Sequence, residues 1–294
     1  MARARRRYPA DRGVTEHSTA VAEAHHRRVA RERRTSLLIS GVSTVIVFGL
    51  AAWWISSAEQ WPAVRNQFFS WEAIQESFPS VLAGFWLNLR IWIVAEVIIL
   101  AFALLLAVLR SLTGPIAAPF RLATIAYIDL FRGVPALLLI LLFGFGVPAL
   151  QLPGLPTSAT FWGSVALIAG YSAYSAEVYR AGMEAVHDGQ RAAARALGLN
   201  QWVTLRFAII PQAIRNVAPA LLNGAVSLQK DVALLSVLGV REAVRAAEIY
   251  TARTFNYSSL IAAAILFLIA SIPLARFTDW YARRDQERRL QRTV

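Results

Sequence analysis

Six runs of apolar residues, each about as long as a membrane-spanning helix, constrain this chain more than any other feature. A helix needs about 20 residues to cross a hydrocarbon core about 30 Å thick. Because nothing in that core can satisfy exposed backbone groups, helices are the natural way to cross it. We therefore expect an all-α protein, a polytopic bundle of six transmembrane helices. The runs cover residues 36–57, 89–109, 122–148, 161–179, 218–240 and 260–280.

Composition supports a membrane protein over a soluble domain. Hydrophobic residues make up 56% of the 294 residues and charged residues 16%, against about 25% in ordinary soluble domains. The net charge of +12 does not indicate nucleic-acid binding, because the arginines lie in the tails and between the apolar runs. With no cysteine in the chain, disulfides and thiolate metal sites are excluded.

The distribution of arginine predicts the orientation. Residues 1–35 contain ten arginines, residues 180–215 five and residues 283–292 five, while residues 149–159 carry no charge. Arginine-rich segments stay in the cytoplasm. We therefore predict that both termini and the 180–215 loop face the cytoplasm, across the cytoplasmic (inner) cell membrane. Residues 241–255 are an exception with three arginines on the outside, and a short amphipathic helix at the outer interface would explain it.

The domain boundaries follow from these runs. We expect a cytoplasmic Arg-rich tail, an extra N-terminal transmembrane helix, a five-helix core that contains a long cytoplasmic loop, and a second cytoplasmic tail. These segments are residues 1–35, 36–57, 81–284 (with the loop at 187–211) and 285–294.

The cytoplasmic loop "HDGQRAAARALGLNQWVTLRFAIIPQAIRN" predicts two short helices. Asp188 can cap the first, which is rich in alanine and arginine. Gly198 stands where a left-handed C-cap is expected, and Asn200 can cap a second helix that ends near Pro211. An apolar knob formed by Leu197, Leu199, Trp202 and Leu205 would enter a partner's groove or lie on the inner leaflet.

Four ordered blocks of sequence resemble the membrane subunits of ATP-binding-cassette importers, and more narrowly the polar amino acid (His/Glu/Gln/Arg-type) subgroup. They are "AYIDLFRGVPALLL", "AYSAEVYRAGMEAV", "GQRAAARALGLNQWVTL" and "SLQKDVALLSVLGV". The third resembles the family's E-A-A-x-x-x-G loop, with Ala192 in place of the glutamate. Val134 and Val232 stand where the family usually has threonines.

The resemblance implies a permease that carries a polar amino acid by alternating access. It implies as partners two ATP-binding-cassette ATPase subunits, a second permease subunit, an extracytoplasmic solute-binding protein and the lipid bilayer, with no nucleic acid. It implies no cofactor in this chain, since ATP and Mg would be bound by the ATPase. The EAA loop would form the coupling helix, through Ala192, Ala193, Ala194, Gly198, Leu199, Trp202, Leu205 and Pro211.

Charges within the apolar runs are expensive unless paired, so they indicate function. Lys230, the only lysine among 30 lysine and arginine residues, lies beside Asp231 in "SLQKDVALL". Because adjacent helical residues point about 100° apart, each needs its own partner. We expect Lys230 to be a buried partner at the translocation interface, although such charges can also simply hold a bundle together. The substrate-pathway candidates are Arg132, Gly133, Pro135, Glu177, Lys230 and Asp231, with Glu96 as a weaker one.

Two of these candidates have a particular local context. Gly133 and Pro135 must interrupt a helix, and such a break is tolerated only against protein or a water-filled cavity. Glu177 can instead form a local pair with Arg180, three residues on.

The sequence also bears on two other classes of function, an enzyme and a secondary transporter. The sequence has no G-x-x-x-x-G-K-[ST] loop, so energy for transport must come from another subunit. No histidine lies in an apolar run and no catalytic string is present, so we expect no enzyme, no catalytic residue and no metal site. A secondary, ion-coupled amino acid transporter remains the alternative, although it would not need the long cytoplasmic loop.

Overall fold

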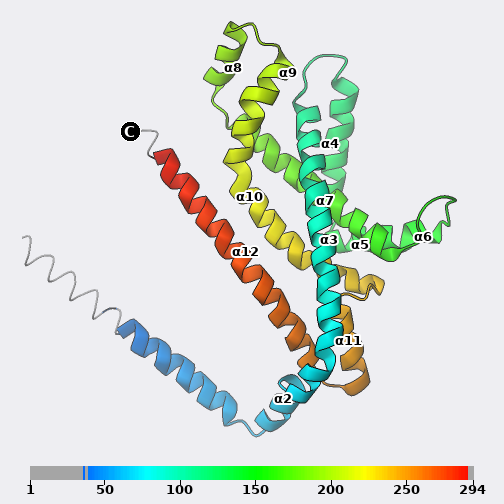
Figure 1. Ribbon diagram of the computed structural model, residues 1–294, viewed down its shortest axis with the longest axis vertical. Helices are drawn as coiled ribbons and strands as arrows, with labels where there is room; N and C mark the ends of the chain where they lie inside the picture. Colours follow the sequence, from blue (N-terminus) through cyan, green and yellow to red (C-terminus); the bar gives the residue numbers. More distant parts are fainter. Residues whose placement is uncertain (1–35, 37–38, 291–294) are drawn as a thin grey trace, which may run out of the picture. The chain divides into compact units, whose positions relative to one another are not determined.

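The computed structural model describes residues 36 and 39–290, the backbone alone for residues 286 and 288–290, and every regular element in this range is helical (Figure 1). The all-α class is therefore confirmed. The chain divides into two compact units, Met1–Val64 and Arg65–Val294. The first contains the helix Ile39–Ser56 and the start of α2 (Trp61–Phe68). The predicted tail 1–35 lies outside the described residues.

The longest helix is α3 (Trp71–Ser111), which runs for 41 residues. Its first residue follows Ser70, whose side chain accepts a hydrogen bond from the Ala73 amide at 3.4 Å. The apolar run at 89–109 covers only the second half of this helix. The first half is helical because Val81 and Phe85 are buried against residues of α11 (Ala243–Thr254) and α12 (Ser258–Leu290).

The third predicted span is broken where the sequence indicated. α4 (Ala118–Gly133) ends, Val134 is extended with φ −95° and ψ 131°, and Pro135 opens α5 (Ala136–Leu141). Proline disfavours the helical conformation of the residue before it, so the chain bends by 104° at this point. The chain continues through the π-helix η1 (Leu142–Gly146) and α6 (Val147–Ala149), which turn away from α4 in Figure 1.

The centre of the core is α7 (Ala159–Glu184), which packs on α3, α4, α5 and α10. Its buried face is built from small residues such as Ala166, Ala173 and Ala176. Gly163 lies where a Cβ atom would come within 2.7 Å of the Leu238 side chain. The small side chains thus allow the neighbouring helices to approach closely.

The chain after α7 forms a hairpin and then two long helices. The hairpin consists of α8 (Asp188–Ala196), α9 (Gln201–Val203) and the π-helix η2 (Thr204–Ile209). α10 (Ile210–Asp231) continues into the 3-10 helix η3 (Val232–Leu238), which ends at Gly239 with φ 79°. The short helix expected at 241–255 is α11, and α12 completes the fold.

Within the described residues, four helical stretches are long and apolar enough to cross a membrane, and the bent pair α4–α6 makes a fifth. The four are Ile39–Ser56, Trp61–Ser111, Gln201–Leu238 and Ser258–Asp285. The run at 161–179 lies within α7, which is one continuous helix but is not among these stretches. Six spans with cytoplasmic termini therefore stay a prediction.

Candidate functional site

A cavity with a volume of about 580 Å³ lies where the α4–α5 break meets α7 and α10. Arg132, Gly133, Pro135 and Asp231, all named from the sequence, line it together. We call this cavity the central pocket. Among the described residues, Arg132 and Asp231 are the only charged side chains that line it, and most of the other lining residues are apolar.

Arg132 is held at the pocket by Tyr174 of α7. The guanidinium lies over the Tyr174 ring, 5.5 Å from its centroid. The Tyr174 hydroxyl donates to the Arg132 carbonyl oxygen at 3.2 Å, which satisfies a backbone acceptor freed near the end of α4. One tyrosine thus positions both the side chain and the backbone of Arg132.

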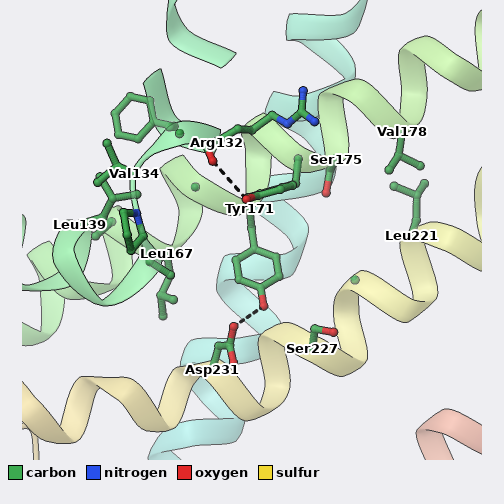
Figure 2. Close-up of a pocket in the computed structure, with 18 of the residues that line it drawn as sticks. Arg132, Val134, Leu139, Leu167, Tyr171, Ser175, Val178, Leu221, Ser227 and Asp231 are labelled. Atoms are coloured by element: carbon green, nitrogen blue, oxygen red, sulfur yellow. Dashed lines mark hydrogen bonds between the residues drawn. The ribbon is translucent and has the colours of Figure 1, made fainter. Parts of the chain in front are cut away.

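Asp231 is held by Tyr171, one helical turn before Tyr174. Figure 2 shows the Tyr171 ring reaching across to α10, where its hydroxyl donates to Asp231 Oδ2 at 2.7 Å. Ser175 and Ser227 add hydroxyl groups to the lining. The central pocket therefore offers a cation and an anion, each with one oriented partner.

The three residues before η3 point in three directions. Gln229 is 1% exposed and accepts a hydrogen bond from Ser271 of α12 at 2.6 Å. Asp231 lines the central pocket, whereas Lys230 is exposed and does not. The helical turn that sends Gln229 to α12 and Asp231 to α7 leaves Lys230 on the outer side of α10. Its expected role as a buried partner at the translocation interface stays a prediction.

Glu177 is part of an ion-pair network outside the central pocket. Its carboxylate pairs with Arg110 at the end of α3 and with Arg180 Nε at 2.9 Å, and Arg180 also pairs with Glu184. The local pair with Arg180 is confirmed. Glu96 is half-buried on α3 and likewise does not line the central pocket.

The loop predicted at residues 187–211 differs from the prediction at both ends. His187 rather than Asp188 is the first cap, since its Nδ1 accepts from the Gly189 amide at 3.0 Å. The second helix does not end near Pro211: the wide turns of η2 pass directly into α10, where Pro211 falls in the first turn and a missing N–H is tolerated.

The turn between the two helices agrees with the sequence. Gly198 has φ 72°, the left-handed conformation expected of a C-cap. Asn200 Oδ1 accepts from the Val203 amide at 2.9 Å and caps α9.

Only part of the predicted docking surface is available to a partner. Leu197 is 78% exposed and Trp202 54% exposed, and Ala192, Ala193, Gly198, Leu199 and Pro211 are also exposed. Leu205 is 5% exposed and Ala194 is buried as well. Including Leu205 in the apolar knob was wrong, because η2 turns it into the core beside Ile209.

Sequence reasoning missed Tyr171, Tyr174 and Arg110. The two tyrosines and Ser175 recur on one face of an apolar helix, and this polar stripe was a usable signal. Arg110 gave none, because its partner Glu177 lies 67 residues away.

Comparison with known proteins identifies the family to which this chain belongs. Residues 113–285 match the family described as "Binding-protein-dependent transport system inner membrane component". The chain belongs to this family. It is therefore a permease subunit of an ATP-binding-cassette importer, a transport component whose ATPase is a separate subunit. The predicted family and the predicted non-enzymatic role are both confirmed.

Relatives span most of the permease. The arginine transport system permease protein ArtQ of Bacillus subtilis is 33% identical over 65% of this chain and 85% of its own length. The glutamate/aspartate import permease protein GltK of Escherichia coli O157:H7 is 30% identical over 74% of this chain and 98% of its own.

Solved structures share the fold. A chain of an amino acid ABC transporter crystallised with histidines superposes with a TM-score of 0.65 at 30% identity, over 73% of this permease and 98% of that chain. The MetNI methionine ABC transporter gives a TM-score of 0.59 at 18% identity, over 70% of this permease and 95% of that chain, and shows the fold alone. Family membership and several apolar helices make this permease a multi-pass membrane protein.

Proposed function

We propose that this permease carries a polar amino acid across the cytoplasmic membrane through the central pocket. The observation that carries the proposal is that Arg132 and Asp231 line the same, mainly apolar cavity. A zwitterionic amino acid has a carboxylate and an ammonium, which these two side chains complement. The apolar lining raises the strength of both interactions, because water screens them less.

The residues around the central pocket suit binding that can be reversed. Tyr171 shares the Asp231 carboxylate at 2.7 Å, and Tyr174 covers the Arg132 guanidinium. Each charge therefore has a neutral partner when no substrate is present, and substrate need only replace a hydrogen bond or a ring contact. The relatives named for arginine and for glutamate/aspartate differ in substrate charge, which supports polar amino acids as the class rather than one member of it.

The hairpin is proposed to transmit the energy of ATP. Exposed residues of α8, of the turn after it and of α9, including Leu197 and Trp202, would dock in a groove of an ATPase subunit. Because η2 is continuous with α10 and buries Leu205 and Ile209 in the core, movement of the hairpin would move α10 and with it Asp231. That movement would switch the central pocket between the two sides of the membrane.

The proposed assembly has two ATPase subunits, which bind ATP and Mg, an extracytoplasmic binding protein and a second permease subunit. Lys230 supports the second permease: it is exposed on this chain within the stretch Gln201–Leu238. An ammonium facing lipid near the middle of a bilayer is unfavourable by about 3 kcal/mol or more. A protein neighbour or a water-filled pathway on this side of α10 removes that penalty.

Uptake into proteoliposomes tests the proposal. The permease would be reconstituted with its ATPase and binding protein, and radiolabelled arginine, glutamine, glutamate and histidine would be offered in turn. We expect uptake to require ATP and to be lost in Asp231→Ala and in Arg132→Ala. The control is Arg253→Ala, which replaces an exposed side chain of α11 and should leave uptake unchanged. Uptake that ignores ATP and collapses with an ionophore would instead identify a secondary transporter.

A further inference from the structure

A second cavity, with a volume of about 330 Å³, lies between the hairpin and the ends of α3 and α7. We call it the hairpin cavity. Two arginines of α8, Arg191 and Arg195, line it. Its remaining lining residues, in the described part of the chain, include hydroxyl and amide side chains but no aspartate or glutamate. The cavity is therefore cationic and has no internal counter-ion.

The spacing of the two arginines brings their like charges together on one face of α8, which is unfavourable for the helix. Residues four apart on a helix share one face, and like charges at this spacing weaken the helix. Arg191 Nη2 donates to the Met183 carbonyl at 2.8 Å, which uses only one of the five N–H groups of its guanidinium. Arg195 has no ion-pair partner within the described residues. An anion in the hairpin cavity would relieve the repulsion and engage the free donors.

The other lining residues supply neutral donors. Thr204 is 8% exposed, and its hydroxyl has no hydrogen-bond partner among the described residues. A buried hydroxyl without a partner is unfavourable, so an acceptor bound beside Thr204 would gain a hydrogen bond. Gln201 Oε1 accepts a hydrogen bond from the Thr113 hydroxyl at 2.9 Å. The N–H groups of the Gln201 amide are therefore available to donate to a ligand.

We propose that the hairpin cavity binds a phosphate-type oxyanion, either inorganic phosphate or the phosphate of a lipid headgroup. Its available donors belong to Arg191 and Arg195 of α8, Gln201 of α9 and Thr204 of η2, which all line the same cavity. A tetrahedral group with several charged oxygens suits such a set, and guanidinium groups bind it by paired hydrogen bonds. The bound anion would tie the hairpin to the helical core. This binding does not depend on the cargo or on the energy source of transport.

Binding is measured on the complete complex of permease and ATPase. Inorganic phosphate would be titrated calorimetrically into the complex in detergent, and the lipids retained after purification from phosphatidylglycerol-containing nanodiscs would be counted by native mass spectrometry. The test variant is Arg195→Gln. The matched control is Arg206→Gln, which removes an exposed arginine of the same hairpin that lies over Phe207 and does not line the cavity. Phosphate bound by the ATPase is common to all variants and cancels in the comparison.

We expect Arg195→Gln to weaken phosphate binding at least tenfold, or to abolish retention of phosphatidylglycerol, with Arg206→Gln unchanged. Loss in the phosphate titration identifies a free anion, and loss in lipid retention alone identifies a headgroup. If Arg195→Gln prevents assembly, the isosteric Thr204→Val takes its place and should weaken the same binding several-fold. Wild-type binding of both ligands by the variant that assembles would overturn the proposal.

Discussion

The hydroxyl of Tyr171 donates a hydrogen bond to Asp231 Oδ2 at 2.7 Å, joining α7 to the end of α10 across 60 residues of sequence. A hydrogen bond to a charged group contributes about 1.5–3 kcal/mol. It also fixes the direction of the one carboxylate in the central pocket. Its removal should therefore affect both stability and binding.

Tyr171→Phe removes this hydrogen bond and keeps the ring. We expect the purified complex to unfold at lower temperature and the KM for amino acid uptake to change more than the maximal rate. Tyr257→Phe is the control, because that ring stacks on Phe68 at 5.1 Å and its hydroxyl makes no hydrogen bond within the described residues. Equal behaviour of the two variants would contradict a role for the Tyr171 hydroxyl.

Arg110 and Glu177 join the ends of α3 and α7 through an ion pair whose side chains are 25% and 16% exposed. Because the pair is neither fully exposed nor fully buried, we expect a coupling energy of about 1–2 kcal/mol in a double-mutant cycle. Arg110→Ala and Glu177→Ala, alone and combined, would be compared by chemical denaturation of the complex. Strictly additive losses would show that the two side chains do not interact in solution.

Gly84 allows α3 to lie close to the backbone at the start of α11. A Cβ atom there would lie 2.5 Å from the Glu242 carbonyl carbon and 2.6 Å from the Ala243 nitrogen, which are backbone atoms and cannot turn aside. Gly84→Ala should destabilise the permease by about 1–3 kcal/mol or more by forcing α11 away from α3. Gly146→Ala is the control, since nothing lies within 4 Å of its added methyl group. Thermal unfolding that shifts alike for both variants would be inconsistent with this packing.

Gly198 keeps the hairpin turn in the left-handed region at φ 72°. Alanine is strained there by about 1–2 kcal/mol, whereas asparagine tolerates the conformation. We expect Gly198→Ala to lower ATP-driven uptake and Gly198→Asn to retain most of it, because only the first distorts the link between α8 and α9. An equal fall in uptake in both variants would show that this position must lack a side chain, whatever backbone conformation the new residue tolerates.

Glu242 caps α11, accepting from the Val244 and Arg245 amides at 3.0 Å and 2.7 Å. Burial raises the pKa of this carboxyl above its ordinary value, although the two amide hydrogen bonds oppose the shift. A raised pKa favours folding below it, so this contribution is lost as the pH rises through the folded-state pKa. Glu242→Gln cannot titrate.

The stability of wild type relative to Glu242→Gln should therefore increase when the pH falls from about 7.5 to about 5.5. Unfolding temperatures of the two complexes at both pH values give this difference. A difference that stays constant or shrinks on acidification would show that the carboxyl does not titrate with a raised pKa.

Several parts of the fold could be read from the sequence because their causes are local. Long apolar runs predicted helices, since a backbone in lipid must satisfy its own hydrogen bonds. Gly133, Val134 and Pro135 predicted the break between α4 and α5, because proline restricts the residue before it. Gly198 and Asn200 predicted the hairpin turn through backbone conformation and side-chain capping.

The tertiary structure decided what each polar side chain meets. Helical spacing showed that Lys230 and Asp231 diverge, but it could not say that Asp231 would meet Tyr171 and that Lys230 would be left on the outer side of α10. It equally could not place Leu205 in the core or bring Arg110 to Glu177. Periodicity fixes the angle of a residue on its own helix, whereas its partner depends on which helices pack beside it, and that follows from contacts between residues far apart in the chain.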